Sequence, residues 1–231
     1  MAYLTVVPYR NPLLQAKSMT SLDVLSAGRA TFVLGTGYLR SEFAALGVDF
    51  AERNELFDEA VEVLKGIWST DDFRYEGRHF TAHGTIIRPG PVQKPHPPLW
   101  LGGNAGVVME RVAKWGEGWA PLIGLSTTVR TRAIDSLADL RSAITELGGR
   151  LEAHGRALDD IDILAGGLNA VPDHQNGVAH QREELERLAD MGVTWTIVRL
   201  PQGVGVGATL EAIRSFGKEV AAGFSSKSPA Q

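Results

Sequence analysis

The sequence predicts an α/β fold built on parallel strands. Short apolar segments typical of strands alternate along the chain with segments typical of helices, which is the order of successive βα units. The strand segments are almost continuously apolar, as strands buried on both faces of a sheet are. We see no internal repeat and no linker, and 231 residues with 44% hydrophobic content suffice for one large core. We therefore expect a single domain over residues 1–220.

Three of the six expected strands lie in the first half of the chain. Asn11 is placed to cap a helix that begins at Pro12, where the missing N–H of proline costs nothing. Helix 51–68 has the clearest apolar periodicity. The expected strands here are 2–7, 30–34 and 99–101, and the expected helices are 12–25, 38–46 (a short helix or turn), 51–68 and 105–114.

A long connection, residues 69–98, precedes the strand at 99–101. Aromatic residues flank Glu76-Gly77, which suggests a small hairpin. Five prolines between residues 89 and 98 then favour an extended run. A connection of this length usually is functional or carries its own small structure, so we expect a hairpin-containing insertion.

The second half of the chain continues the alternation. Gly192 lies just beyond a helical segment, where it is expected to end the helix. The expected strands are 161–165 and 194–200 and a short one within 115–121; the expected helices are 127–154, broken near Gly148-Gly149, and 181–191 and 209–220, followed by a flexible tail from 221 to 231.

Composition excludes several classes of function. The formal net charge is -4, so no basic surplus indicates nucleic acid or an anionic membrane as a partner. The chain has no cysteine, which excludes disulfides, thiol catalysis and cysteine-ligated metals. No apolar run is long enough to span a bilayer, and the first residues lack the pattern of a signal peptide. We expect a soluble cytoplasmic protein.

The segment from Pro97 to Asn104 has the local pattern of an anion-binding turn. A buried strand runs into Gly102-Gly103, and a helix begins at once. Glycines allow close approach of the backbone, and the N–H groups of a helix N-terminus attract a phosphate. Gly203–Gly207, before the last helix, is a rival phosphate-binding loop, with a flexible loop as the alternative.

Parallel βα units form either a doubly wound sheet or a (β/α)8 barrel, and both bind ligands beyond the C-terminal ends of the strands. Three side chains near such ends are candidates for binding. Arg10 could meet an acidic substrate or a cofactor tail, although arginine often pairs on the surface instead. Tyr38 and Trp119 could stack on a planar ring, with ordinary packing as the alternative.

No catalytic side chain can be identified from the sequence. None of the six histidines has metal-ligand spacing on a helix, and most are expected at the surface. His174 alone follows a strand closely enough to approach the ligand. Glu42 and Glu117 are expected to fix loops rather than to act as general acids.

Three ordered motifs resemble the luciferase-like monooxygenase family. They are residues 22–29 followed by 35–43, the segment 91–103, and the segment 116–119. The resemblance is strong from residue 2 to about 122, and it is weaker but collinear to about 220. The most similar branch is the one associated with the deazaflavin coenzyme F420.

The resemblance implies a (β/α)8 barrel that binds coenzyme F420, or else FMN, at the C-terminal ends of its strands. The glycine pair would hold the cofactor phosphate, the segment after the second strand would lie along the ring system, and a tryptophan would line the pocket. No metal is implied. The residues that the resemblance assigns to cofactor binding are Gly35, Thr36, Gly37, Tyr38, Gly102, Gly103, Asn104 and Trp119.

This chain departs from the family pattern at its start, because two βα units usually precede the segment that matches residues 2–10. About six of eight units are therefore expected, with strands 2–7 and 194–200 lacking neighbours. Unpaired edges invite pairing with another chain, so we expect a homodimer. A late start codon, a fragment and a genuine short form are all compatible with the sequence.

The implied function is an oxidoreductase that transfers hydride to or from a small organic substrate, or inserts oxygen when reduced FMN is the cofactor. One alternative is a shortened, non-catalytic member of the same fold that binds a flavin or only dimerises. A second alternative is an unrelated barrel enzyme that acts on a phosphorylated metabolite.

Overall fold

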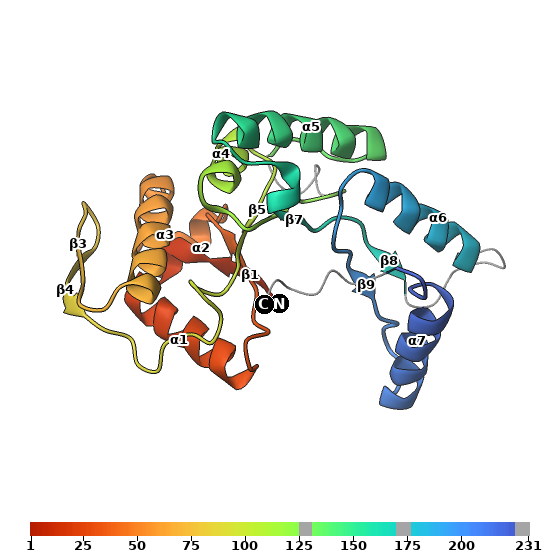
Figure 1. Cartoon of the computed structure of the whole chain (residues 1–231), viewed down its shortest axis with the longest axis horizontal. Coiled ribbons are helices and arrows are strands. Elements are labelled where there is room, and N and C mark those ends of the chain that lie inside the picture. The colour runs from red at the N-terminus through yellow and green to blue at the C-terminus, as the bar shows by residue number, and fades with distance from the viewer. Residues whose placement is uncertain (125–130, 170–176, 225–231) are drawn as a thin grey trace. The chain divides into compact units, whose positions relative to one another are not determined.

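The computed structural model describes residues 1–124, 131–169 and 177–224, with only the backbone described for residues 168 and 169 (Figure 1). The chain divides into two units, Met1–Gly118 and Trp119–Gln231. The expectation of one domain over 1–220 stays a prediction. The expected tail lies outside the described residues from 225 onward, as do the first residues of the expected helix 127–154.

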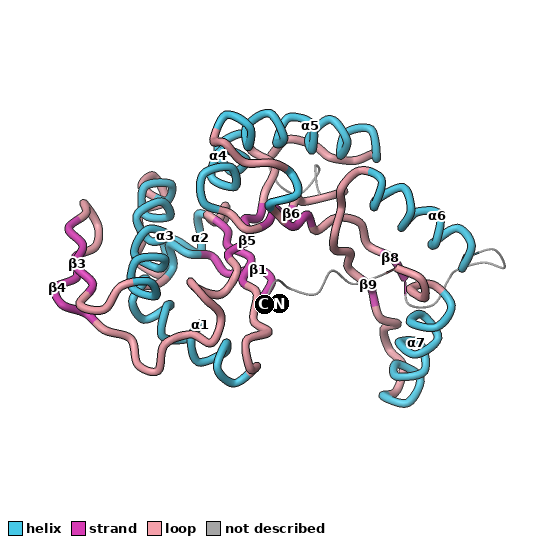
Figure 2. Tube along the Cα trace, in the orientation of Figure 1, coloured by secondary structure: helices cyan, strands magenta, loops and turns pink. Residues whose placement is uncertain are grey.

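The first unit contains the βα alternation that the sequence predicts, with a hairpin inserted after its third α-helix (Figure 2). Its elements are β1 (Ala2–Val6), the 3-10 turn η1 (Val7–Tyr9), α1 (Pro12–Leu25), β2 (Phe32–Gly35), α2 (Arg40–Ala45), α3 (Arg53–Ser69), β3 (Phe73–Glu76), β4 (Thr81–Thr85), β5 (Leu99–Gly102) and α4 (Gly106–Trp115).

Three parallel strands of this unit lie in the order β1-β2-β5. Val6 is paired with Gly35, and Leu34 is paired with Leu101, so the three strands end at the same edge of the sheet. The segments that follow β1, β2 and β5 therefore start side by side. In the described part of the chain β1 pairs with β2 alone, which leaves its other side as an open edge, as expected.

Local signals in the sequence explain several of these elements. The Leu13 N–H donates to Asn11 Oδ1 at 2.9 Å, which confirms the predicted cap of α1. The predicted hairpin is confirmed as β3 and β4, which pair antiparallel. The Glu59 carboxylate of α3 accepts hydrogen bonds from the N–H groups of Arg78 and His79, so the hairpin turn is tied to α3.

The core of the first unit lies between its sheet and its helices. The predicted core residues Trp68 and Trp100 are buried, and the Trp68 indole N–H donates to Thr20 Oγ1 at 2.9 Å. This bond joins α3 to α1, which pack against each other (Figure 1).

The second unit carries shorter strands between longer helices. In the strand order β6 lies next to β7, and the Leu164 N–H donates to the Trp119 carbonyl at 2.9 Å. Its elements are β6 (Gly118–Ala120, which begins at the last residue of the first unit), α5 (Leu137–Ala153), η2 (Leu158–Asp160), β7 (Asp162–Ile163), β8 (Leu168–Asn169), α6 (Gly177–Asp190), β9 (Val198–Arg199) and α7 (Val206–Glu219).

Two predictions for this unit were wrong. Residues 131–136 are not helical, because Ser136 caps α5 by accepting a hydrogen bond from the Asp139 N–H. The helix also runs unbroken through Gly148-Gly149. Two interior glycines cost about 1 kcal/mol each relative to alanine, and the burial of Leu147 and Leu151 on either side offsets that cost.

Strand lengths in this unit also differ from the prediction. Segment 194–200 forms only the two-residue β9 and an isolated bridge between Leu164 and Trp195. Its partner β8 was not predicted, because two residues are too few to give a periodic pattern. Gly192 has a φ of +88° just beyond α6, which fits the predicted stop.

Candidate functional site

The two glycine segments singled out from the sequence come together in the first unit. Leu34 pairs with Leu101, so Gly35 and Gly102 are the next residues on neighbouring strands. A Cβ atom on either glycine would overlap the side chain of Leu4, which comes from β1. Glycine at both positions thus leaves room for the Leu4 side chain at the edge where a ligand would bind.

The neighbouring glycines have backbone conformations that favour glycine. Gly37 has a φ of +83°, and a Cβ there would lie 2.7 Å from Phe43 and 2.8 Å from Val6. Gly103 has a φ of +130°, and a Cβ there would lie 3.3 Å from Val108 of α4. The turns after β2 and β5 therefore depend on glycine for geometry as well as for space.

The N-terminus of α4 follows β5 after a short turn. Ala105 is its N-cap and makes no side-chain capping bond. The N–H groups of Gly106 and Val107 lie in the first turn, where no intrahelical acceptor exists. Asn104 beside them is buried. Donors of this kind, at the positive end of a ten-residue helix, fit the phosphate group that the sequence predicts here.

Thr36 is held by a buried arginine from α4. The Nη1 of Arg111 donates to Thr36 Oγ1 at 3.1 Å. The same guanidinium donates through Nε to Asp58 Oδ1 at 2.6 Å and through Nη2 to Asn54. Arg111 thus ties the turn after β2 to α3.

Aromatic residues surround the start of α2. Tyr38 is 57% exposed, so its ring is open to a ligand. The Tyr9 hydroxyl donates to Glu42 Oε2 at 2.6 Å, and its ring lies edge-on to Phe43 at 4.9 Å between centroids. Burial, followed by this bond and the charge of Glu42, raises the pKa of Tyr9 to about 12. Tyr9 therefore keeps its proton at neutral pH.

Glu117 makes contacts that stabilise the fold, in line with the expected structural role. Its Oε2 accepts a hydrogen bond from the Leu99 N–H at 2.9 Å, and its Oε1 lies 3.2 Å from Lys65 Nζ. These contacts fix the first residue of β5 against α3. Glu42 likewise binds a neighbouring side chain, Tyr9.

The other candidates stand apart from this group. Arg10 is exposed, and Trp119 is fully buried in the second unit, which fits the packing alternative. A contact between Trp119 and a ligand stays a prediction. His174 lies outside the described residues. Cβ atoms on Gly203, Gly205 and Gly207 would meet nothing within 4 Å. Gly205 is the N-cap of α7 and Gly207 lies in its first turn, so the phosphate-binding loop and the flexible loop both stay predictions.

Of the described histidines, His83, His154 and His180 are exposed, in line with the expectation for most of them, and two are not. His79 lies between the hairpin and α3, with Nε2 at 3.6 Å from Glu55. His96 is buried, and its ring lies 6.0 Å from that of Trp68. Both pack onto α3, which the sequence pattern of the insertion did not indicate. Within the described ranges, no group of three potential ligands could hold a metal ion.

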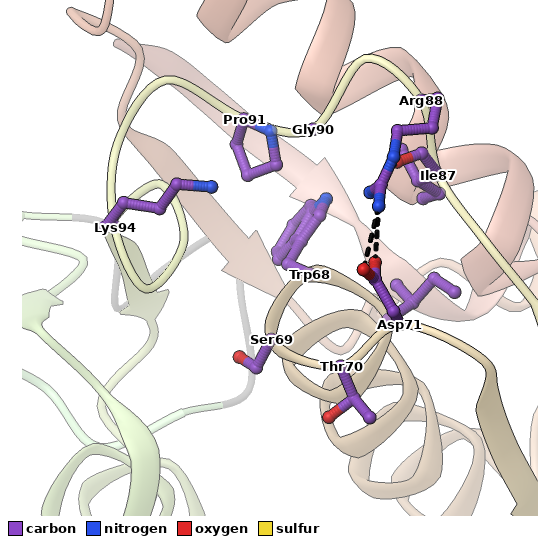
Figure 3. Close-up of a pocket in the computed structure, with 10 residues that line it drawn as sticks. Trp68, Ser69, Thr70, Asp71, Ile87, Arg88, Gly90, Pro91 and Lys94 are labelled. Carbon is purple, nitrogen blue, oxygen red and sulfur yellow. Dashed lines mark hydrogen bonds and ion pairs between the residues drawn. The ribbon is translucent and has the colours of Figure 1, made fainter.

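Two cavities lie at other places. The first, of about 340 Å³, lies where α3 ends and the insertion returns, and Arg88 and Asp71 form an ion pair at 2.8 Å across it (Figure 3). The second, of about 570 Å³, lies in the second unit among α6, α7 and β9. No residue that we assigned to cofactor binding lines either one.

Parallel strands, intervening helices and a glycine-lined edge beside the N-terminus of α4 define a βα protein, a class in which ligands bind at the C-terminal ends of the strands. The sequence pattern of the luciferase-like monooxygenase family matches residues 3–219, so the chain belongs to that family. In the described residues, no helix is long and apolar enough to cross a membrane.

Solved structures show the same fold. A monooxygenase, RslO1 from Streptomyces bottropensis, matches 95% of this chain and 76% of its own, with a TM-score of 0.75 and 18% identity. A coenzyme F420 dependent tetrahydromethanopterin reductase from Methanopyrus kandleri matches 94% and 80%, with a TM-score of 0.69 and 17% identity. The fold is α/β of TIM-barrel type, and the chain spans an incomplete barrel.

A curated relative matches only part of the chain. It is an FMNH(2)-dependent dimethylsulfone monooxygenase from Pseudomonas putida, 31% identical over 111 residues. The match covers 46% of this chain and 31% of the relative. The chain thus matches about a third of the length of the first curated relatives.

The sequence did not point to Arg111, Leu4 or Tyr9. Arg111 stands among apolar residues of α4, and its partners lie 53 to 75 positions away. Leu4 lies next to Gly35 and Gly102 only because β1, β2 and β5 are paired in the fold. Such pairings across the fold leave no periodic trace in one sequence.

Proposed function

We propose that this chain is a flavin- or deazaflavin-dependent oxidoreductase. The observation that carries the proposal is the meeting of Gly35–Tyr38 with Gly102–Asn104 at one edge of the first unit, beside the N-terminus of α4. Family membership agrees with this choice of cofactor class. The reaction is hydride transfer or monooxygenation of a small organic substrate.

The residues of this edge fit a phosphate-bearing cofactor. The N–H groups of Gly106 and Val107 are the donors that a phosphate would use. The Thr36 hydroxyl and the exposed ring of Tyr38 lie on the neighbouring segment, where the ring system would extend. When bound, the cofactor supplies the redox chemistry, and these residues bind and orient it.

Coenzyme F420 is our preferred cofactor, with FMN as the alternative. The motifs resemble the deazaflavin branch of the family, whereas one curated relative is named as FMNH(2)-dependent. Solved structures of similar fold include F420-dependent enzymes, but at 15% and 17% identity they carry the fold alone. The choice therefore needs a binding measurement.

Titration of the folded chain with each cofactor, followed by visible absorbance and fluorescence, tests the proposal. We expect saturable one-to-one binding, tighter for coenzyme F420 than for FMN. Tighter binding of FMN would show that FMN is the cofactor and would leave the proposed oxidoreductase function unchanged. Absence of binding by both, with a cooperative thermal transition intact, would contradict the proposal.

The expected homodimer also remains a proposal. Leu14, Leu22 and Leu25 are exposed on α1, and Tyr3 is exposed on the open edge of β1. Exposed apolar groups beside an unpaired strand favour association. Light scattering after size exclusion should give twice the chain mass of 24.9 kDa. A cytoplasmic location likewise stays a prediction.

A second candidate is a member of the family that binds a flavin without turnover. The open edge of β1 favours it, because in the described residues no strand lies on that side to supply groups around a reactive ring. Binding of a cofactor without reduction or oxidation of any tested substrate is its expected signature. The third candidate, an unrelated barrel enzyme, is excluded by the family match over residues 3–219.

A further inference from the structure

Arg111 is a buried cation that donates hydrogen bonds through four of its five N–H groups within the first unit. Its side chain is 4% exposed. Nε donates to Asp58 Oδ1 at 2.6 Å, and Nη2 donates to the backbone oxygen and to Oδ1 of Asn54, both at 3.1 Å. The guanidinium also lies 4.7 Å from the ring centre of Phe57. These contacts hold the arginine in one place against α3.

The hydrogen bond between Arg111 and Thr36 determines whether the Thr36 hydroxyl acts as a donor or as an acceptor. Nη1 lies 3.1 Å from Thr36 Oγ1. A guanidinium only donates, so the threonine hydroxyl must accept this bond. Among the described residues, the hydroxyl of Thr36 makes no other hydrogen bond. Its single hydrogen therefore remains for another acceptor, and the residue is only half-buried.

We propose that Arg111 is a positioning residue that fixes Thr36 as a hydrogen-bond donor toward an oxygen of the ligand. The inference rests on the proposed function, because it concerns the ligand of the same edge. Arg111 itself does not touch the ligand. It donates a hydrogen bond to a lone pair of Thr36 Oγ1, and the hydroxyl hydrogen is then directed away from Arg111, toward the ligand.

The charge distribution supports an indirect role for the arginine. Asp58 pairs with Nε, so the positive charge of Arg111 is largely compensated inside the unit. A hydroxyl that accepts a bond from a cation donates more strongly to the next acceptor. The matching ligand group is an acceptor without hydrogens, either a phosphate oxygen or a ring carbonyl oxygen.

Two substitutions at Thr36 distinguish the contribution of the hydroxyl to binding from that of the side-chain shape. Thr36→Val removes the hydroxyl with little change in volume, and Thr36→Ser keeps it. Loss of one hydrogen bond to a charged or polarised group should weaken cofactor binding about tenfold in Thr36→Val. Thr36→Ser should bind within about threefold of the unsubstituted chain, since its hydroxyl can still be held by Arg111.

A double-mutant cycle tests whether Arg111 acts through Thr36. Arg111→Lys should weaken binding in the chain that retains Thr36 and should have no further effect beside Thr36→Val. Riboflavin, which lacks the phosphate, identifies the acceptor. If Thr36→Val weakens riboflavin as much as FMN, the acceptor is a ring carbonyl oxygen; if riboflavin is unaffected, the acceptor is the phosphate.

Thermal unfolding of each variant is the control for folding. Should Arg111→Lys fail to fold, the comparison of Thr36→Val with Thr36→Ser still decides. Equal binding by the unsubstituted chain and Thr36→Val would overturn the inference and leave the proposed function standing. Failure of the unsubstituted, folded chain to bind either cofactor would overturn both.

Discussion

The side chain of Leu4 occupies the space that a Cβ atom on Gly102 would need. The same leucine also fills the space beside Gly35. The sequence assigns Gly35 and Gly102 to ligand binding. In the structure the absence of a side chain at both positions also leaves space for Leu4 of β1. A substitution at either position should therefore lower the stability of the fold, in addition to any effect on ligand binding.

Gly102→Ala should destabilise the chain by about 1–3 kcal/mol, because the added methyl group overlaps Leu4. Gly149→Ala in α5 is the matched control, since a Cβ there meets nothing within 4 Å. It should stabilise the helix by up to about 1 kcal/mol. Denaturant unfolding of both variants measures the difference.

Leu4→Ala provides the check on this explanation. In that background Gly102→Ala should cost less than it does alone, because the overlap has been removed. Strict additivity of the two substitutions would show that Leu4 is not the reason for the glycine.

Tyr38→Ala should weaken cofactor binding about tenfold and leave stability unchanged, because the ring is exposed and available for stacking. Tyr38→Phe should retain most of the affinity, since stacking needs the ring and not the hydroxyl. Fluorescence titration measures both variants. Unchanged affinity in Tyr38→Ala would remove this residue from the site.

Glu117→Ala should lower stability by about 1–2 kcal/mol, because it leaves the Leu99 N–H without its acceptor and Lys65 without its ion pair. Glu117→Gln keeps an acceptor for Leu99 and should recover part of that loss. Unfolding midpoints report the effect. If Glu117→Gln abolished turnover while stability stayed intact, Glu117 would be an acid or base and not a structural residue.

The elements of the first unit were predictable because their signals are local. Asn11 followed by Pro12 marked the start of α1, and the glycine pair after an apolar run marked the end of β5. The second unit was harder to predict. Its strands are two or three residues long, so they carry no period.

The candidate site was predictable only in part, for the same physical reason. The segments Gly35–Tyr38 and Gly102–Asn104 were found by turn chemistry and by family resemblance. Their neighbour Arg111 was not, because its contacts with Asp58 and Thr36 depend on how α4 packs on α3. Long-range pairing is a property of the fold, and one sequence does not display it.

Stability at alkaline pH should depend on Tyr9. The pKa of this phenol rises from 10.0 to about 12 in the folded chain, so folding favours its protonated form. Its contribution is therefore full below the unfolded value and is lost as the pH rises toward 12. The pKa of Tyr75 is raised to about 12 as well, by burial and by its bond to Glu62.

Tyr9→Phe removes one of these two groups. Its urea midpoint should fall less between about pH 9 and about pH 11.5 than that of the unsubstituted chain, with Tyr75 and Tyr3, whose pKa burial also raises, contributing to the remaining fall. An equal fall in both proteins would mean that folding does not raise the pKa of Tyr9, either by burial or by the bond to Glu42.

The most direct measurement of the central claim is a map of backbone amide shifts by nuclear magnetic resonance as coenzyme F420 is added. The account predicts that the largest changes fall on Thr36, Gly37, Gly106 and Val107, at the edge formed by β2, β5 and α4. Largest changes at Gly203–Gly207, with the first unit unaffected, would contradict it and place the phosphate at the rival loop.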